Sequence, residues 1–135
     1  MERGKADFRA LREELGLTQK DVAEQLGVQA QTVKKWEALN HPYDPPESAW
    51  MWLEDMDTQR ILLAERAVDA VKGLEMREGA EPQEVTLKYF RDQDDYNRHG
   101  RDDGPFGLVN ARSRSIAKEL RRQGFRVRFV YPDEG

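Results

Sequence analysis

The side chains best suited to metal or acid–base chemistry lie in one polar stretch, residues 91–104. It carries five aspartates and one histidine, namely Asp92, Asp94, Asp95, His99, Asp102 and Asp103. The stretch lacks the Asp-x-Asp-x-Asp-Gly spacing of a calcium loop. The chain has no cysteine and only one further histidine, His41, so no histidine or thiolate set supports the carboxylates. We therefore predict a solvated loop here, with no catalytic residue, no metal site and no cofactor.

A second group of reactive side chains is basic and lies near the end of the chain. It consists of Arg112, Arg114, Lys118, Arg121, Arg122, Arg126 and Arg128. The simplest interpretation is the solvated face of an amphipathic helix; the alternative is auxiliary contact with phosphates, including RNA binding. The net charge of −4 does not exclude an anionic partner, because residues 41–83 alone hold four Lys/Arg and ten Asp/Glu. Both ends of the chain can therefore present basic faces.

Three short helices are predicted in the first 38 residues. The first covers residues 6–15 and ends at Gly16, whose lack of a Cβ suits a left-handed residue. The second begins at Thr18, a good N-cap, and ends at Gly27, and the third covers residues 30–38. Their inward residues are Phe8, Leu11, Leu15, Val22, Ala23, Leu26, Val28, Val33 and Trp36.

A proline-rich connection, residues 40–46, separates these helices from a longer helical region. Asp44 is the predicted N-cap, with Pro45 and Pro46 in the first turn and Glu47 as the capping-box acid. Apolar spacing then continues to about Met76, as one helix or as two, with an apolar face wide enough to need a partner surface.

The rest of the chain predicts a strand, a helix and a strand. After a polar hinge at 79–82, these elements are expected from Glu84, over 106–123 and over 125–131, with a loop at 91–104. The fold class is therefore α+β, with domains at 1–78 and 83–135. The two strands could be parallel within one chain or could pair across a dimer.

One run of residues, 17–37, resembles the helix-turn-helix of the Cro/C1 repressor (XRE) family. The similarity rests on Leu17-Thr18-Gln19, Ala23 where two helices cross, Gly27-Val28 at the turn, Thr32-Val33 and Trp36-Glu37. The resemblance implies that the helix at about 30–38 enters a major groove of DNA. The chain departs from the family pattern at Gln29, where serine or threonine is usual, and at 38–46, which replaces a shorter glycine turn.

The resemblance assigns two sets of contact residues. Base edges would be contacted by Gln29, Ala30, Gln31 and Lys34. Phosphates would be contacted by Gln19, Lys20, Lys35 and Arg9, with Lys5 and Arg3 as further candidates. Glutamine caps a helix poorly but pairs well with adenine, so we expect Gln29 to contact DNA.

The order of elements is also similar to the phage and mobile-element repressors that accompany anti-CRISPR genes. That similarity implies a homodimer and autoregulation. We therefore predict a non-enzymatic repressor that binds inverted-repeat double-stranded DNA. The alternative is an antitoxin whose C-terminal unit binds a toxin protein. A cytoplasmic location is expected, since no apolar stretch approaches the roughly 20 residues that span a membrane and residues 1–12 lack a secretory signal.

Overall fold

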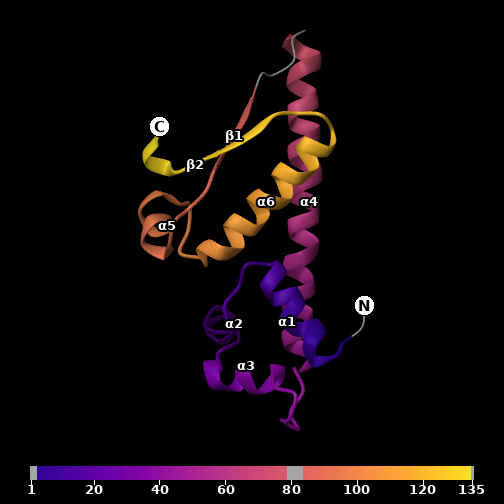
Figure 1. The fold of residues 1–135 in the computed structure, drawn as a ribbon, viewed down its shortest axis with the longest axis vertical. Helices are drawn as coiled ribbons and strands as arrows, with labels where there is room; N and C mark the ends of the chain where they lie inside the picture. Colours follow the sequence, from indigo (N-terminus) through magenta and orange to yellow (C-terminus); the bar gives the residue numbers. More distant parts are fainter. Residues whose placement is uncertain (1–2, 79–83, 135) are drawn as a thin grey trace. The chain divides into compact units, whose positions relative to one another are not determined.

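A computed structural model of the 135-residue chain describes residues 3–78 and 84–134. Within these ranges the chain forms six α-helices, two β-strands and a short C-terminal 3₁₀ helix (Figure 1). The contacts divide it into two compact units, 1–58 and 59–135, and the boundary falls inside the long helix α4. This content confirms the α+β class. The domains 1–78 and 83–135 remain a prediction.

The first three helices are α1 (Lys5–Glu14), α2 (Gln19–Leu26) and α3 (Ala30–Glu37). They form where the apolar spacing predicts them, and their ends have identifiable causes. Gly16 and Gly27 take left-handed φ values of +71° and +68° at the ends of α1 and α2. Thr18 caps α2 because its hydroxyl accepts the Asp21 amide at 3.0 Å, and the Asp21 carboxylate accepts the Thr18 amide in return.

The core of the N-terminal unit is built around aromatic rings. Phe8 packs edge-on against Trp36 and Trp50, with ring centroids 6.1 and 5.2 Å apart. Val28, predicted to lie beneath the third helix, is 36% exposed, because it follows Gly27 in the turn outside α3. The other buried apolar residues of this unit are Leu11, Leu15, Leu17, Val22, Ala23, Val33, Ala49 and Leu53.

Helix α4 is a single helix, Glu47–Glu78. Its predicted start at Asp44 is wrong: the first helical hydrogen bond runs from the Trp50 amide to the Pro46 carbonyl, at 3.2 Å. The physical reason is that a residue before proline disfavours the α conformation, which applies to Asp44 and to Pro45. Within α4, the Thr58 hydroxyl donates to the Glu54 carbonyl at 3.0 Å, so Thr58 is an interior residue and starts no second helix.

In the C-terminal unit, β1 (Val85–Lys88) and β2 (Val127–Val130) pair in parallel within one chain. The crossover contains α6 (Phe106–Arg122), which packs on both strands. Asn110 of α6 accepts the Phe90 amide at 2.9 Å and donates to the Phe90 carbonyl at 2.8 Å. This buried side chain extends the hydrogen bonding beyond the end of β1.

The stretch 91–104, predicted to be a loop, contains the helix α5 (Gln93–His99). Asp92 is its N-cap, with a side-chain oxygen accepting the Asp95 amide at 2.8 Å. The prediction of a loop was wrong, because regularly spaced apolar residues are what indicates a helix in a sequence, and this polar stretch has none. The helix is held by one buried aromatic residue, Tyr96, whose ring lies 4.8 Å from that of Phe90.

Candidate nucleic-acid interface

The outer face of α3 is polar and exposed. Val33 and Trp36 are buried. The four predicted base-contacting residues are all exposed: Ala30, Gln31 and Lys34 in the helix, and Gln29 just before it. A helix fixed by two core residues presents its remaining side chains in a constant arrangement. Such a face has the dimensions and hydrogen-bonding groups that a major groove accepts.

Gln29 is the N-cap of α3, with extended backbone at φ −82° and ψ 149°. Its side chain makes no capping hydrogen bond, unlike that of Thr18 in α2. The glutamine amide is therefore not used for capping, and contact of Gln29 with DNA stays a prediction.

A buried ion pair joins α1 to α3. Arg12 donates from Nε and Nη2 to the two Glu37 carboxylate oxygens, at 2.7 and 2.8 Å, and from Nη1 to the Leu17 carbonyl at 2.9 Å. The side chains of Arg12 and Glu37 are only 10% and 4% exposed. The hydrogen bonds to Glu37 raise the pKa of Arg12 above its ordinary value. Sequence reasoning missed this pair, although Glu37 stands beside the core residue Trp36.

The same carboxylate also positions Gln19. The Gln19 amide nitrogen donates to Glu37 Oε1 at 3.1 Å, so this half-buried side chain links the first turn of α2 to the end of α3. The amide groups of the first turn of a helix point outward without helical partners, which suits a phosphate. Gln19 thus braces the two helices, and its contact with a phosphate stays a prediction.

The positively charged residues predicted to contact phosphate fall into two groups. Lys20, Lys35 and Arg9 are exposed; Lys20 lies 3.9 Å from Glu24 and Arg9 lies 3.5 Å from Glu13. Such exposed pairs are weak and can release a cation to a phosphate. Arg3 and Lys5 are occupied within the unit. Arg3 binds Glu47 and Glu54, and Lys5 binds carbonyl oxygens at the end of α3.

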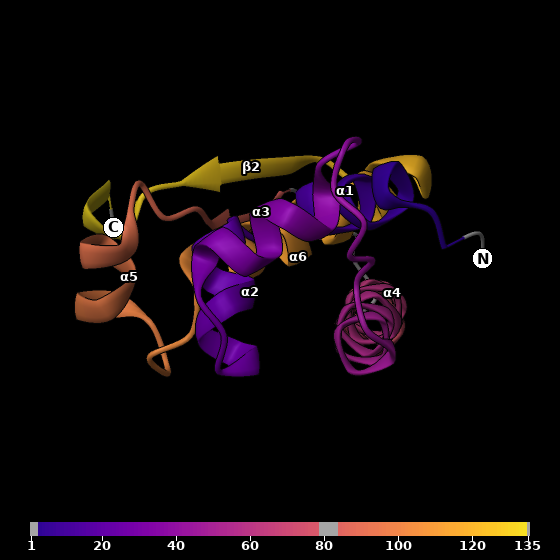
Figure 2. The same cartoon turned by 90° about the horizontal axis from the view of Figure 1, so that it is seen from below.

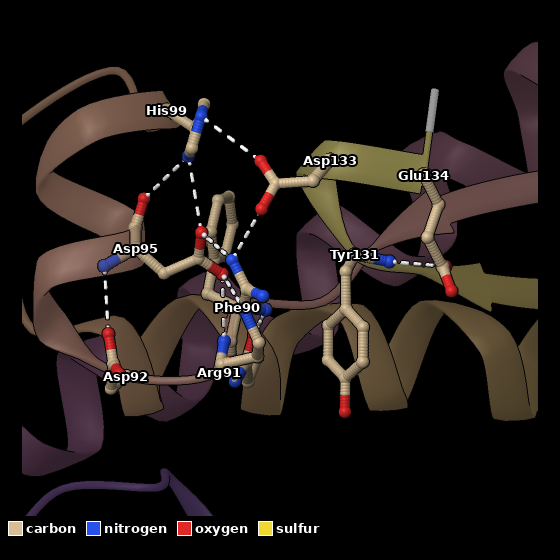
Figure 3. Close-up of polar contacts among 9 residues, drawn as sticks. Phe90, Arg91, Asp92, Asp95, His99, Tyr131, Asp133 and Glu134 are labelled. Atoms are coloured by element: carbon tan, nitrogen blue, oxygen red, sulfur yellow. Dashed lines mark hydrogen bonds and ion pairs between the residues drawn. The ribbon is translucent and has the colours of Figure 1, made fainter.

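In the C-terminal unit, charged side chains converge on Arg91 (Figure 3). Arg91 Nη2 lies 3.2 Å from Asp95 and 2.6 Å from Asp133 of the 3₁₀ helix (Pro132–Glu134). His99 Nδ1 lies 3.2 Å from Asp95, and Nε2 lies 3.5 Å from Asp133. The Arg91 side chain lowers the pKa of Asp95. The network joins α5 to the C-terminal end of the chain.

Asp95, His99 and Asp133 are also the three described residues whose possible metal-ligating atoms lie within 4.8 Å of one another. Arg91 already donates to both carboxylates, so a cation there would have to displace a guanidinium. The geometry therefore describes an ion network that stabilises the fold. Asp95 is buried, which corrects the interpretation of 91–104 as a solvated loop.

The basic residues of α6 are largely occupied by the unit itself. Arg112 donates to Gln59 at 3.2 Å, Arg114 to the Tyr89 hydroxyl at 2.6 Å and Arg121 to the Val127 carbonyl at 3.0 Å. Arg122 pairs with Glu119, and its hydrogen bonds lower the pKa of the Glu119 carboxyl. The first three contacts link α6 to α4, to Tyr89 just after β1 and to β2.

The N-terminal geometry, with two helices joined at a left-handed glycine and the second exposing a polar face, defines a helix-turn-helix. The helix-turn-helix family model matches residues 8–41. This part of the chain is therefore similar to the helix-turn-helix of Cro/C1-type regulators, which bind DNA. No curated protein matches the chain. Among the described residues, none of the helices is both long and apolar enough to cross a membrane.

Proposed function

We propose that the protein is a homodimeric repressor that binds an inverted-repeat operator by placing α3 in the major groove. The observation that carries this proposal is the exposed polar face of α3 opposite its two core residues. Gln29 and Gln31 each can pair with adenine N6 and N7, Ala30 can pack on a thymine methyl and Lys34 can reach guanine acceptors.

Phosphate contacts would fix the register of α3. Gln19 and Lys20 lie in the first turn of α2, while Lys35 and Arg9 are exposed on neighbouring helices of the same unit. These four residues would position the protein on any sequence, and the α3 residues would select among sequences.

Repression and dimerisation belong to the same proposal. Two recognition helices related by a two-fold axis would bind half-sites centred about 34 Å apart. The C-terminal unit would supply the dimer contact, because the sheet formed by its described residues has two strands, and two strands alone are marginally stable in water. The protein would repress its own gene by occupying an operator at that gene's promoter.

The decisive experiment is selection of bound DNA. The purified chain is passed over a random double-stranded DNA library at about 0.15 M salt, the retained DNA is sequenced and the mass of the protein in solution is measured. We expect a palindrome bound by a dimer. An absence of enrichment would contradict the proposal, and a stoichiometric partner protein co-purifying from the native host would favour the antitoxin alternative.

A further inference from the structure

An open pocket lies in the C-terminal unit, at the carboxyl ends of the two parallel strands. Its volume is about 360 Å³, and it is lined by Tyr89, Arg114, Phe129, Val130, Tyr131 and Glu134. Tyr89 directly follows β1, and Val130 and Tyr131 stand at the end of β2. The carboxyl ends of parallel strands are where open α/β sheets bind small ligands. The proposed binding of DNA by α3 does not use this pocket.

The walls of the pocket are aromatic rings, and arginines hold them in place. The rings of Tyr89 and Phe129 pack edge-on, with centroids 5.3 Å apart. The guanidinium carbon of Arg121 lies 5.5 Å from the Phe129 centroid. That of Arg91 lies 5.4 Å from the Tyr131 centroid. Rings that are fixed before binding lose little conformational freedom when a ligand packs on them.

The backbone of Tyr131 is fixed as well. Its amide donates to Glu134 Oε2 at 2.8 Å, within the 3₁₀ turn, and Figure 3 shows Tyr131 between Arg91 and Glu134. The turn lies beside α5 (Figure 2), where Asp133 is 3.5 Å from His99. This 3₁₀ turn is therefore an ordered part of the pocket wall.

Arg114 brings to the pocket a positive charge that the unit does not neutralise. Its Nη1 donates to the Tyr89 hydroxyl at 2.6 Å, and this partner is uncharged. Within residues 3–78 and 84–134, no carboxylate forms an ion pair with Arg114. A guanidinium has five N–H donors in a planar fork that matches the two oxygens of a carboxylate. Arg114 is exposed, so it can receive a carboxylate from a ligand without breaking an ion pair.

Glu134 and the size of the pocket restrict the ligand further. The Glu134 carboxylate repels a second negative group on the ligand, whereas a ligand hydroxyl can donate to it. A volume of about 360 Å³ is near the lower end of the range for ligand sites, so it suits one ring rather than several. The walls, the charge and the size thus favour the same kind of molecule.

We propose that this pocket binds a small aromatic molecule with one ring and one carboxylate. The ring packs against Phe129 and Tyr131, and the carboxylate accepts hydrogen bonds from Arg114. A hydroxyl group on the ring donates to Glu134. The inference assigns a ligand site to the C-terminal unit and does not rest on the proposed binding of DNA.

The test is an NMR titration of the isotope-labelled full chain with 4-hydroxybenzoate. A ligand of about ten non-hydrogen atoms should bind with a Kd on the order of 0.1 to 1 mM. The backbone amide signals should shift most at residues 89, 114 and 129–134. Phenol lacks the carboxylate and terephthalate carries a second one, so each should bind about tenfold more weakly than 4-hydroxybenzoate.

Substitutions of Arg114 test the role of its charge and shape. Arg114→Gln should weaken binding of 4-hydroxybenzoate about tenfold, because it removes the cation. Arg114→Lys keeps the charge but loses the planar fork, so it should weaken binding about threefold. The matched control is Arg126→Gln, which changes a 74% exposed arginine just before the opposite end of β2. This control should bind as the wild type does.

Substitution of Tyr131 tests the aromatic wall. Tyr131→Ala should weaken binding of 4-hydroxybenzoate by about three- to tenfold, because the ligand ring loses a packing surface. The matched control is Tyr43→Ala, which removes a 65% exposed tyrosine from the N-terminal unit and should leave binding unchanged. Thermal unfolding and light scattering verify the fold and the mass of each variant. The comparison of the three compounds uses the wild type, so it remains decisive if a variant unfolds.

Each outcome supports or overturns the inference. Equal binding by the wild type, Arg114→Gln and Tyr131→Ala overturns it, as does a wild type that binds none of the three compounds. A variant that loses the mass of a dimer assigns the pocket to contact between copies of the chain and also overturns it. A protein that selects operator DNA without binding 4-hydroxybenzoate loses this inference alone. One that binds 4-hydroxybenzoate through Arg114 and selects no DNA retains it and loses the proposed function.

Discussion

At the scale of single residues, Arg12 and Glu37 do most to fix the candidate interface. Their ion pair joins α1 to α3, and the same Glu37 carboxylate holds Gln19 at the start of α2. The exposed face of α3 is therefore positioned by charges that lie underneath it. A defect in this pair would alter DNA binding without removing any group that touches DNA.

Glu37→Gln should lower the free energy of unfolding by about 3 kcal/mol, because it leaves the Arg12 charge buried with only the Leu17 carbonyl and a weaker acceptor. Urea unfolding measures the loss. The matched control is Glu13→Gln, which removes an exposed partner of Arg9 and should cost at most about 0.5 kcal/mol. Equal losses for the two variants would show that the buried pair contributes no more than a surface one.

Gln31 and Lys35 should separate base recognition from phosphate binding. Gln31→Ala should cost about 1 to 3 kcal/mol at one base step of the operator and little on unrelated DNA. Lys35→Ala should weaken binding to all sequences alike and reduce the salt slope by about one. Binding to the operator and to operators with single substitutions measures both effects. Equal losses on every sequence for both variants would argue against base recognition by Gln31.

At the scale of elements, the sequence predicts best what regular spacing and caps determine. Thr18, Gly16 and Gly27 place the helix ends in the N-terminal unit, and each has the capping contact or the positive φ that its residue type suggests. The start of α4 is two residues later than predicted, because Asp44 and Pro45 each precede a proline. At Asp44 the preference of aspartate for the N-cap competes with the restriction on residues before proline, and the proline restriction prevails.

What the sequence could not predict depends on contacts between distant residues. Helix α5 cannot be predicted from its polar sequence. Its stability comes from Tyr96 packing on Phe90 and from an ion network that includes Asp133. In the candidate interface, the exposed residues of α3 follow from helical spacing alone. The roles of Arg12, Glu37 and Lys5 require the folded arrangement, since each binds a residue at least 25 positions away.

Asp95 should make the stability of the C-terminal unit depend on pH in the acidic range. The hydrogen bond from the Arg91 side chain lowers the pKa of Asp95 below its ordinary value of 3.8. Stabilisation by this carboxylate is therefore fully present above pH 3.8 and is lost as the pH falls through the lower pKa of the folded state. Asp95→Asn should be less stable than the wild type at pH 7.

The test compares unfolding by urea at pH 7 with unfolding at successively lower pH. The difference between the wild type and Asp95→Asn should narrow once the pH falls below 3.8. Asp94→Asn, which changes an exposed carboxylate in the same helix, should show a much smaller difference at pH 7. A constant difference between the wild type and Asp95→Asn at every pH would mean that lost packing, and not charge, causes the effect.

At the scale of the whole molecule, the proposed function requires two copies of the chain. One α3 of eight residues can contact only a few base pairs, and an operator selected by one such helix would occur too often to be specific. A dimer doubles the contacts without a larger fold. Its two-fold symmetry also dictates that the operator be an inverted repeat, with its half-sites on the same side of the double helix.

The spacing of the half-sites therefore tests the assembly directly. Inserting about five base pairs, half a helical turn, between the half-sites turns one of them to the opposite side of the DNA. Binding of the dimer should then fall to the affinity for a single half-site, whereas a monomer that binds each half-site independently would lose nothing. Light scattering on the same sample should give the mass of two 15.7 kDa chains. An operator whose affinity is unaffected by the insertion would contradict the dimer, because a rigid two-fold pair of α3 helices cannot follow a half-site around the double helix.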